Sequence, residues 1–476
     1  MVKITPDIGR TFGEFSLMPG FTTKDCVLRN IDLSTDLAGL KLKIPLMSSA
    51  MTSVTEYELA LALGKNGGIG ILPTRLSADA QAEIVEKIKT HEMAFVEEPL
   101  SIRNDQTVEI AMRFVRRIGH SAIPVVDKNN VFVGMFSLQH YWDSEVSISD
   151  SVTKAMILPK DLPIVDDPDI GIEEAKKLLE KNGIDRLVVL DKEGRLEKMA
   201  FGQDMEKIKV GVAISTHKGW KEKVKKTVDA GADLVVIDTS DAYNEFTKDV
   251  LQEYKAMEFQ IPICAGNVVT YEAAEFLMES GADMVKVGMS SGSICITQRE
   301  KATGRAPMTA LIEVGKARDD YFEKTGKYVS VIIDGGISST ADMVIALTVA
   351  DAIMMGGYFN KFYEAAAEKL DYKGKETRIE AEMYEVATWG EGSHRARNLD
   401  RYGQSRKTFF AEGVEGTVKY GGRIKPALKT DMMKIKGALS NTGCMNLKEF
   451  REKAVIEVIS SFSSQIITNP HDMKKQ

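Results

Sequence analysis

The sequence has few cysteines, and no two of them are spaced for a shared task. Its 476 residues contain four, Cys26, Cys264, Cys295 and Cys444, which lie far apart. Without a C-x-x-C pair, a zinc knuckle and a thioredoxin-type redox pair are excluded. Four cysteines are also too few for a disulfide scaffold. Each is therefore expected to be a small buried apolar residue unless its surroundings indicate otherwise.

Positive charge and long apolar runs are also scarce. The chain has 62 Lys and Arg against 69 Asp and Glu, a net charge of −7. Because nucleic acids bind basic faces, this balance excludes a nucleic acid as the main ligand, although a local pocket for one phosphate is still allowed. No apolar run is long enough to span a membrane, and residues 1–10 lack the apolar core of a signal peptide. We therefore expect a cytoplasmic protein with no membrane partner.

The glycine motifs of open nucleotide-binding sheets are missing too. No G-x-G-x-x-G follows an early strand and no P-loop occurs, which weakens a doubly wound sheet as an alternative. Present instead are eight short apolar runs, each followed by a helical pattern, as is typical of strands buried on both faces. This alternation predicts an α/β fold, a (β/α)8 TIM barrel. The runs lie at residues 44–50, 68–72, 210–214, 234–238, 261–266, 284–288, 329–335 and 352–357.

The alternation is interrupted once, between the second and third runs, by residues that contain their own repeat. The segment 119–127 (GHSAIPVVD) aligns with 183–191 (GIDRLVVLD). Each copy follows an amphipathic helix and precedes a turn, so two small α/β units are expected to pair. The pattern resembles a tandem CBS module, or Bateman domain. We predict this inserted domain at 93–207, between two parts of the barrel at 1–92 and 208–476.

The segment after the eighth run has a different character. Residues 389–422 are rich in Gly and Arg and show no clear period. Such a stretch inside a compact enzyme predicts a mobile flap or a disordered loop. Arg401, Tyr402 and Glu412 stand out in it, although a surface ion pair is the commoner role of an arginine. Helical patterning returns at 425–439 and 447–458.

The loop after the sixth run carries a candidate nucleophile. Barrel active sites lie at the carboxyl ends of the strands, where residues 288–298 read GMSSGSICITQ. Backbone N–H groups in such a loop can hold a phosphate, and Ser293 adds a hydroxyl donor. A thiol beside these donors, with Lys286 nearby, tends toward the nucleophilic thiolate, which makes Cys295 a candidate. The alternative is a buried loop cysteine.

Glycine pairs follow the next two runs. Asp334, Gly335 and Gly336 follow the seventh run, and Gly356 and Gly357 follow the eighth. Glycines at these positions form the common phosphate site of barrels, and a carboxylate can accept two sugar hydroxyls. Together the loops predict a site for a nucleoside monophosphate. Taken singly, each glycine pair more often marks only a tight turn.

Polar residues follow the fourth and fifth runs as well. Asp238, Thr239 and Ser240 follow one, and Asn267 follows the other. Because these ends are adjacent on the barrel rim, they predict a site for a second ligand. The alternative for Thr239 and Ser240 is simple helix capping.

Taken together, these motifs resemble the IMP dehydrogenase family over nearly the whole chain. The resemblance rests on S-I-C-I-T at 293–297, D-G-G at 334–336, M-G-G at 355–357, S-S-A-M at 48–51 and the pair Arg401-Tyr402. The G-E-G-S at 390–393 and the D-T-S-D at 238–241 are most similar to the protozoal and bacterial members. No single motif is specific, whereas their combination is.

The resemblance implies oxidation of inosine 5'-monophosphate (IMP) to xanthosine 5'-monophosphate (XMP) with NAD+, in guanine nucleotide biosynthesis. It implies that Cys295 forms a thioimidate at C2 of the purine and that Arg401, with Tyr402 and Thr297, activates water, with Glu412 as an alternative proton relay. The implied substrate contacts are Ser48, Met51, Ser293, Asp334, Gly335, Gly336, Gly356, Gly357, Gly390, Glu391, Gly392 and Ser393. The implied cofactor contacts are Asp238, Thr239, Ser240, Asn267, Lys286 and Gly288.

The resemblance also carries expectations about ions, effectors and assembly. It implies a K+ site built from the backbone carbonyls of Ser290, Gly292 and Cys295, but the tail at 466–472 (IITNPHD) lacks the glutamate that completes it in the family. Whether K+ is required therefore stays open. The paired repeat implies an adenine or guanine nucleotide at the CBS module. The family forms homotetramers that can pair into octamers.

Two alternatives differ in chemistry. GMP reductase shares the barrel, the cysteine loop and the IMP site, but it deaminates GMP with NADPH and typically lacks the Arg-Tyr pair. Arg401 and Tyr402 therefore favour the dehydrogenase. The second alternative is a non-catalytic barrel that senses nucleotides, and the presence of Cys295, Thr297 and Arg401 together argues against it.

Overall fold

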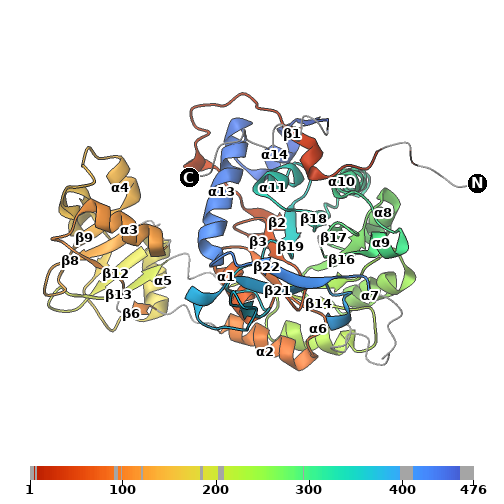
Figure 1. Cartoon of the computed structure of the whole chain (residues 1–476), viewed down its shortest axis with the longest axis horizontal. Helices are drawn as coiled ribbons and strands as arrows, with labels where there is room; N and C mark the ends of the chain where they lie inside the picture. The colour runs from red at the N-terminus through yellow and green to blue at the C-terminus, as the bar shows by residue number, and fades with distance from the viewer. Residues whose placement is uncertain are drawn as a thin grey trace, which may run out of the picture. The chain divides into compact units, whose positions relative to one another are not determined.

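The structure is a computed structural model of the chain (Figure 1). It describes residues 5, 8–90, 95–97, 99–118, 122–182, 186–201, 208–292, 294–396 and 411–460. The chain divides into two compact units, one formed by residues 1–90 with 208–476 and the other by residues 91–207. Each unit has its own sheets and its own buried cores.

The first unit is a closed barrel of eight parallel strands, which confirms the predicted fold. Each strand overlaps one of the eight apolar runs, and β19 pairs with β4 to close the circle. Residues alternate between two environments, as the period of a strand requires. On β15, Leu234 and Val236 belong to the barrel interior, whereas Val235 and Ile237 pack outward with the helices. The strands are β4 Leu46–Ser48, β5 Ile69–Leu72, β14 Val210–Ile214, β15 Leu234–Asp238, β16 Ile263–Val268, β17 Met284–Val287, β18 Ser330–Asp334 and β19 Ala352–Met355.

Helices follow the strands and surround the barrel (Figure 1). Several begin where a polar side chain caps the first turn: the Ser77 hydroxyl accepts from the Ala80 N–H at 3.1 Å, and Asn244 Oδ1 accepts from the Thr247 N–H at 3.0 Å. The helices are α1 Tyr57–Lys65, α2 Ala78–Lys89, α6 Trp220–Asp229, α7 Glu245–Ala256, α8 Tyr271–Glu279, α9 Thr297–Lys301, α10 Pro307–Thr325, α11 Thr340–Ala346, α13 Ile424–Asn441 and α14 Leu447–Lys453.

A hairpin closes the amino-terminal end of the barrel. Strands β2 (Thr35–Leu37) and β3 (Leu40–Leu42) pair with each other, and their leucines pack into the barrel interior. The Thr35 hydroxyl donates to the carbonyl of Asp351, directly before β19. With this end closed, the opposite, carboxyl end is left to form the site.

Two predictions for the C-terminal region were wrong in part. The helix expected over 447–458 ends at Lys453, and β23 (Ile456–Val458) pairs instead with β1 (Phe15–Leu17). The flap region expected to be irregular contains a short helix, α12 (His394–Ala396), and a strand, β22 (Glu415–Lys419). Strand β22 pairs with β21 (Glu385–Trp389), which pairs with β20 (Lys369–Leu370). Strands β22 and β23 form by pairing with strands that are distant in the sequence. The local sequence pattern does not show such partners, so it could not predict either strand.

The second unit contains two four-stranded sheets, one for each copy of the repeat. Their orders are β10-β9-β8-β7 and β11-β12-β13-β6. The turn of each copy bonds to the other: the Phe132 N–H donates to the Gly194 carbonyl and the Leu196 N–H to the Asn130 carbonyl, both at 3.0 Å. The elements are β6 Val96–Glu97, β7 Ile102–Arg103, α3 Val108–Ile118, β8 Ala122–Val126, β9 Phe132–Ser137, α4 Leu138–Trp142, β10 Met156–Ile157, β11 Ile164–Val165, α5 Ile172–Asn182, β12 Arg186–Leu190 and β13 Leu196–Phe201.

None of the helices in the described parts of the chain is both long and apolar enough to cross a bilayer.

Candidate active site

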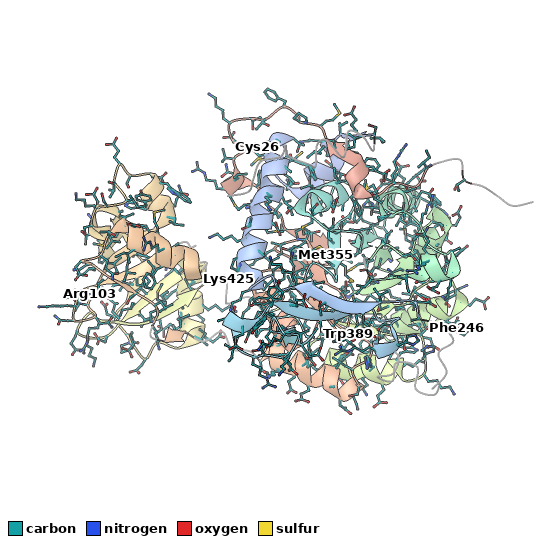
Figure 2. All side chains as sticks on the ribbon, viewed as in Figure 1. Cys26, Arg103, Phe246, Met355, Trp389 and Lys425 are labelled. Carbon is teal, nitrogen blue, oxygen red and sulfur yellow. The ribbon has the colours of Figure 1, made fainter. Side chains whose placement is uncertain are left out.

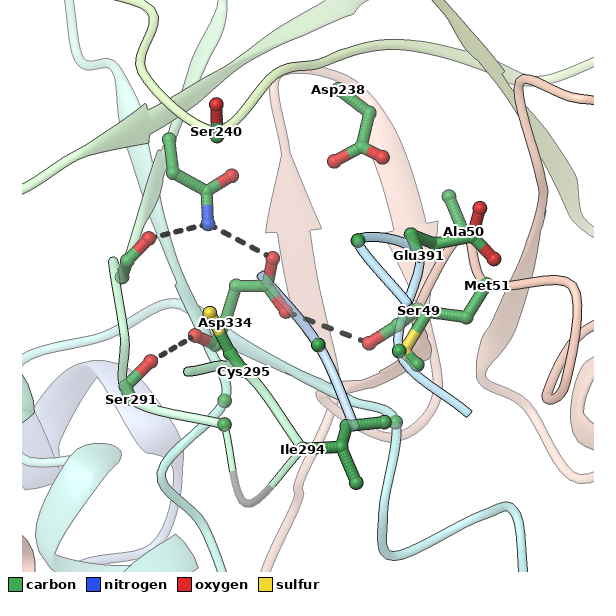
Figure 3. A pocket seen from close by; sticks show the side chains of 18 of the residues that line it. Ser49, Ala50, Met51, Asp238, Ser240, Ser291, Ile294, Cys295, Asp334 and Glu391 are labelled. Atoms are coloured by element: carbon green, nitrogen blue, oxygen red, sulfur yellow. Dashed lines mark hydrogen bonds between the residues drawn. The ribbon is translucent and has the colours of Figure 1, made fainter. Parts of the chain in front are cut away.

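A cavity of about 840 Å³ lies at the carboxyl ends of the barrel strands. Residues at or just after the carboxyl end of each of the eight strands line it, together with residues of the flap region, among them 390–392 and 412–413. Figure 3 shows polar side chains of these loops pointing toward one another around Cys295. The volume is in the range of sites for small molecules and cofactors.

Most of the predicted site residues line this cavity. They are Met51, Asp238, Thr239, Ser240, Asn267, Gly288, Ser290, Gly292, Cys295, Thr297, Asp334, Gly335, Gly336, Gly356, Gly357, Gly390, Glu391, Gly392 and Glu412. Ser293, Arg401 and Tyr402 lie outside the residues that the structure describes.

Three predicted contacts are placed elsewhere. Ser48 is fully buried and its oxygen accepts from the Thr55 hydroxyl, so that the neighbouring Ser49 lines the cavity instead. Ser393 is buried too, and its hydroxyl accepts from the Ala396 N–H at 3.1 Å, as a helix cap does. Lys286 is 1% exposed and lies beneath the cavity. The structure therefore places these three side chains outside the lining of the cavity, and their contact with a ligand stays a prediction.

Cys295 differs from the other cysteines by its exposure. Cys26, Cys264 and Cys444 are buried, whereas Cys295 is exposed and lines the cavity. Burial raises the pKa of the Cys264 thiol to about 12, which keeps it protonated and inert. The Cys295 sulfur lies 3.2 Å from the hydroxyl oxygen of Thr297, the first residue of α9. Of the four thiols, only that of Cys295 is therefore placed to react with a ligand in the cavity.

Asp334 is held in place by bonds to several loops, drawn in part as dashed lines in Figure 3. One carboxylate oxygen accepts from the Ser49 hydroxyl at 3.5 Å, and the other accepts from the side-chain amide of Asn267 at 3.2 Å and from Lys286 at 2.7 Å. The Ser291 hydroxyl donates to its carbonyl at 3.0 Å. The carboxylate that was predicted to bind sugar hydroxyls is thus fixed at the cavity wall.

Lys286 connects the two predicted ligand sites from below. Its ammonium group pairs with Asp334 at 2.7 Å and with Asp238 at 3.1 Å, and it also bonds to the Asn267 side chain. Burial acts to lower the pKa of Lys286, but the two carboxylates outweigh it and raise the pKa above its usual range. Lys286 therefore stays charged and acts on the cofactor side only through the residues that it holds.

The glycines predicted to bind phosphate allow close approach. A side chain on Gly288 would meet the Asp334 carbonyl at 2.2 Å, and one on Gly356 would meet the Met51 sulfur at 2.6 Å. Gly335 and Gly336 have φ of +84° and +76°, which other residues rarely adopt. Packing within the protein therefore requires glycine at Gly288 and Gly356, backbone conformation favours it at Gly335 and Gly336, and all four line the cavity.

The polar residues after β15 are not helix caps. Asn244 caps α7, whereas the Thr239 hydroxyl donates to the Gly266 carbonyl at 3.0 Å and Ser240 lines the cavity. Phe246, labelled in Figure 2, lines the same end with 70% of its side chain exposed. The sequence did not indicate this ring as part of the site. An apolar residue is expected in the core, and only the fold shows that Phe246 is exposed.

The flap region docks beside Cys295 through its backbone. The Ile296 N–H donates to the Glu412 carbonyl at 2.9 Å, and the Val414 N–H donates to the Ile294 carbonyl at 3.0 Å. Cys295 and Gly413 thus face each other in an antiparallel bridge. This register places the Glu412 side chain next to Thr297, with 3.5 Å between Glu412 Oε2 and the hydroxyl oxygen.

A second anchor, which the sequence analysis missed, fixes Glu391. One of its carboxylate oxygens accepts from the Thr52 N–H at 2.6 Å and from the Thr52 hydroxyl at 2.7 Å. The Trp389 indole donates to the same hydroxyl at 2.9 Å, and the Arg395 guanidinium lies 3.9 Å over the indole ring. The 389–392 segment is thereby tied to the loop after β4.

Among the described residues, no group of three or more His, Cys, Asp and Glu side chains could hold a metal ion. The expected K+ site would consist of backbone carbonyls and not of such side chains. Of those carbonyls, that of Gly292 accepts from the Cys295 N–H at 3.2 Å, which leaves it a second lone pair.

The barrel, the cavity and the exposed thiol have the arrangement of a candidate enzyme site, and comparison with known proteins gives the class, a nucleotide-binding oxidoreductase. Residues 9–471 match the IMP dehydrogenase / GMP reductase domain, so that the chain belongs to this family. It is 33% identical to inosine-5'-monophosphate dehydrogenase from Tritrichomonas foetus, with 97% of this chain and 96% of that protein covered. The enzyme of the same name from Aquifex aeolicus is 31% identical, with 95% and 94% covered.

A solved structure supports the fold. A cysteine-to-alanine variant of GMP reductase from Trypanosoma brucei, in complex with guanosine 5'-monophosphate, aligns with a TM-score of 0.69 over 98% of both chains at 22% identity. At this identity, the likeness shows the architecture alone.

Proposed function

We propose that the protein oxidises IMP to XMP with NAD+, through a covalent thioimidate on Cys295. The observation that carries this proposal is the exposed Cys295 thiol in contact with Thr297, whose hydroxyl in turn faces Glu412, in a cavity that Asp334 and the glycine pairs also line. Membership of the family and relatives named as dehydrogenases at 31–33% identity support it. XMP formation then feeds guanine nucleotide synthesis.

The substrate would lie along the seventh and eighth strands. The Asp334 carboxylate would accept hydrogen bonds from the ribose hydroxyls, and backbone N–H groups around Gly335, Gly336, Gly356 and Gly357, with Ser293, would hold the phosphate. Met51 would lie under the purine, and the 390–392 segment would border its edge.

The cofactor would lie at the opposite end of the cavity. NAD+ supplies an acceptor for the hydride, and Asp238, Thr239, Ser240, Asn267 and Gly288 would position its nicotinamide ring. The residues fit this group, because the cavity wall here combines fixed polar groups with the exposed ring of Phe246, against which a base can stack.

The reaction has two steps. The Cys295 thiol would release its proton to solvent as its sulfur bonds to C2 of the purine. The C2 hydrogen would leave as a hydride, for which NAD+ held at the cofactor end would be the acceptor, and the purine would remain on Cys295 as the thioimidate. Water then attacks C2, its proton is removed, and the carbon–sulfur bond breaks to release XMP and the thiol. Arg401, with Tyr402 and Thr297, would activate the water, and Glu412 offers a second route for the proton through Thr297.

The first experiment mixes the protein with IMP and NAD+. We expect NADH, seen by its near-ultraviolet absorbance, and XMP, seen by chromatography. Oxidation of NADPH with GMP, without NADH from IMP, would instead assign GMP reductase activity. No turnover with either pair would favour a nucleotide sensor.

The second experiment tests the covalent step. Cys295→Ala removes the nucleophile, so we expect no detectable turnover while IMP still binds in calorimetry. Normal turnover in this variant would exclude the thioimidate. Cys264→Ala is the matched control, because that thiol is fully buried beneath the cavity.

The third experiment separates the two steps. Arg401→Ala is expected to slow hydrolysis of the intermediate far more than hydride transfer, measured as a burst of NADH followed by slow turnover. Equal losses in both steps would show that Arg401 has no specific part in activating water.

The proposal includes the remaining expectations of the family. These are a K+ site at the carbonyls of Ser290, Gly292 and Cys295, an adenine or guanine nucleotide bound by CBS repeats within residues 93–207, and a homotetramer that can pair into octamers. Turnover in K+ against Na+, calorimetry with ATP and GTP, and sedimentation with and without nucleotide test them in turn.

A further inference from the structure

A lysine that no motif singled out lines the cavity next to the last glycine pair. Lys361 belongs to the segment after β19 and lines the cavity together with Gly356 and Gly357. Among the described lining residues that follow β18 and β19, it is the only one with a positive charge. The phosphate of a nucleoside monophosphate carries a charge of about −2 near neutral pH, so a cation at this end can pair with it.

The Lys361 ammonium group has no carboxylate partner among the described residues. Its contacts are with aromatic rings: the nitrogen lies 4.9 Å from the centroid of the Tyr358 ring and 5.2 Å from that of Phe362. Lys286 beneath the cavity is different, because two carboxylates already share its charge. Lys361 is therefore available to pair with an anion that enters the cavity.

The surroundings of Lys361 hold its aliphatic stem in place. The Gly421 N–H donates to the Lys361 carbonyl at 2.8 Å, and a side chain on Gly421 would meet Lys361 Cγ at 2.9 Å. The Tyr358 ring next to the ammonium is fixed as well, since its hydroxyl donates to Asp431 at 2.6 Å. A stem that is held by packing loses less conformational freedom when its ammonium group binds a ligand.

Backbone donors without a described acceptor lie in the same part of the cavity wall. Gly336 and Ile337 after β18 and Gly357 and Tyr358 after β19 line the cavity, and their N–H groups donate to no described acceptor. Backbone N–H groups are usually paired, so donors left over beside a cavity are expected to bind water or a ligand. A phosphate accepts several such bonds at once, and Lys361 would add the charge that the backbone lacks.

We propose that Lys361 binds the 5'-phosphate of the substrate and makes the site selective for nucleotides over nucleosides. The proposal rests on the proposed function for the identity of the substrate, although the phosphate contact would be the same for IMP and GMP. The phosphate takes no part in the two chemical steps, so the contact acts on binding and not on the thiol.

The test compares Lys361→Met and Lys361→Arg with the wild type, with IMP and the nucleoside inosine as probes. Methionine keeps the stem but removes the charge, so we expect the affinity for IMP to fall roughly tenfold or more and that for inosine to stay unchanged. Lys361→Arg keeps a cation and should restore most of the affinity for IMP. Lys324→Met is the matched control, since that lysine is 63% exposed and pairs with Glu275 and Glu279 on α8.

Binding is measured by protection of Cys295 from alkylation by iodoacetamide, which needs no turnover. The ligand concentration that halves the alkylation rate is determined for IMP, GMP and inosine, with Cys295→Ala as the blank. Loss of one ion pair should also make the salt dependence of IMP binding shallower. NADH formation is followed in parallel, and in Lys361→Met we expect KM for IMP to rise while kcat stays within roughly twofold of wild type.

The outcomes separate this proposal from the proposed function. An affinity for IMP that is unchanged in Lys361→Met, or that falls equally with the affinity for inosine, would overturn the phosphate contact. A wild-type thiol that neither nucleotide protects would overturn it too. A loss of affinity for GMP in a protein that makes no NADH would support the contact and overturn the dehydrogenase. Thermal melting of each variant identifies a loss that comes from partial unfolding, and restoration by Lys361→Arg provides a second check.

Discussion

The barrel and the inserted unit differ in what they bury. The barrel unit encloses charged and polar side chains, among them Lys286, Arg318 and Asp351. Among the described residues of 91–207, no polar or charged side chain is buried, and ion pairs such as Arg103–Asp105 and Arg113–Glu109 lie on the surface. Burying a charge costs free energy unless the charge is paired. The buried charges of the barrel unit therefore need a structural or functional explanation.

The buried charges of the barrel unit lie in two places, which indicates two different roles. Lys286 lies under the cavity, where it holds the cavity-lining carboxylates of Asp238 and Asp334. The Asp351 cluster lies at the opposite end, where Arg451 and Tyr328 tie a helix and a loop to the start of β19. A buried charge therefore indicates the functional site only where it lies next to the cavity.

The largest effect is expected from removing the central cation. Lys286→Met leaves the carboxylates of Asp238 and Asp334 without their partner, which we expect to cost about 3–5 kcal/mol of barrel stability and most of the activity. Urea unfolding measures the first and NADH formation the second. Lys434→Met, at a lysine that is 60% exposed, serves as control and should change little. If Lys286→Met were as stable as the wild type, the buried charges would not set the barrel unit apart from the inserted unit in stability.

A core cavity in the inserted unit should affect that unit alone. Phe136 is fully buried in its apolar core, so Phe136→Ala should cost about 3–5 kcal/mol of its stability. We expect the unfolding transition of residues 91–207 to move to lower urea while turnover stays unchanged. Phe322→Ala is the control in the barrel unit, at a ring that is 46% exposed. A loss of turnover in Phe136→Ala would show that the units are coupled.

Replacing residues 91–207 by a short Gly/Ser linker is expected to leave the barrel active. The two chain ends are close, because Lys89 donates to the Ile208 carbonyl at 2.7 Å. Among the described residues, the buried polar groups all belong to the barrel unit, so turnover should stay within roughly twofold of wild type. Calorimetry should show the loss of one unfolding transition. An inactive or unfolded barrel would mean that the inserted unit contributes to the site.

The smallest effect concerns a half-buried lysine. Lys223 donates to the carbonyls of Thr74 and Leu76, in the loop after β5, at 2.7 and 2.5 Å, and burial lowers its pKa to about 8. Between this value and the ordinary 10.5, the folded protein holds fewer protons than the unfolded chain, so this group makes stability rise with pH. The difference in urea midpoint between wild type and Lys223→Met should therefore increase in favour of wild type from pH 7 to pH 10. A constant difference would contradict the lowered pKa.

Local pattern was sufficient for the strands of the barrel but not for each side chain at their ends. The eight apolar runs identified all eight strands, because strands buried on both faces must be apolar throughout. Ser48 and Ser49 could not be separated, since strand period points neighbours to opposite sides and the phase depends on the closed barrel. Ser393 likewise fits a ligand contact or a helix cap in sequence, and α12 uses it as the cap.

Contacts between distant segments were beyond the sequence. Glu412 stands out in the sequence of 389–422 and the family resemblance implies its role, but its bond to Lys301 and the bridge between Cys295 and Gly413 depend on how the flap region packs. The exposed ring of Phe246 and the tie of Thr52 to Glu391 are of the same kind. The residue types involved are common on protein surfaces, so the sequence does not indicate that these side chains contact one another or line the cavity.

The sequence by itself determined the barrel, the paired repeat within it and the family, because these depend on periodic apolar runs and on motifs that are continuous in the chain. The tertiary structure decided which polar residues face the cavity and which lie beneath it. It also decided that Cys295 alone among the four cysteines is exposed. The physical reason is that strand phase, burial and the docking of loops follow from long-range packing, which no local pattern records.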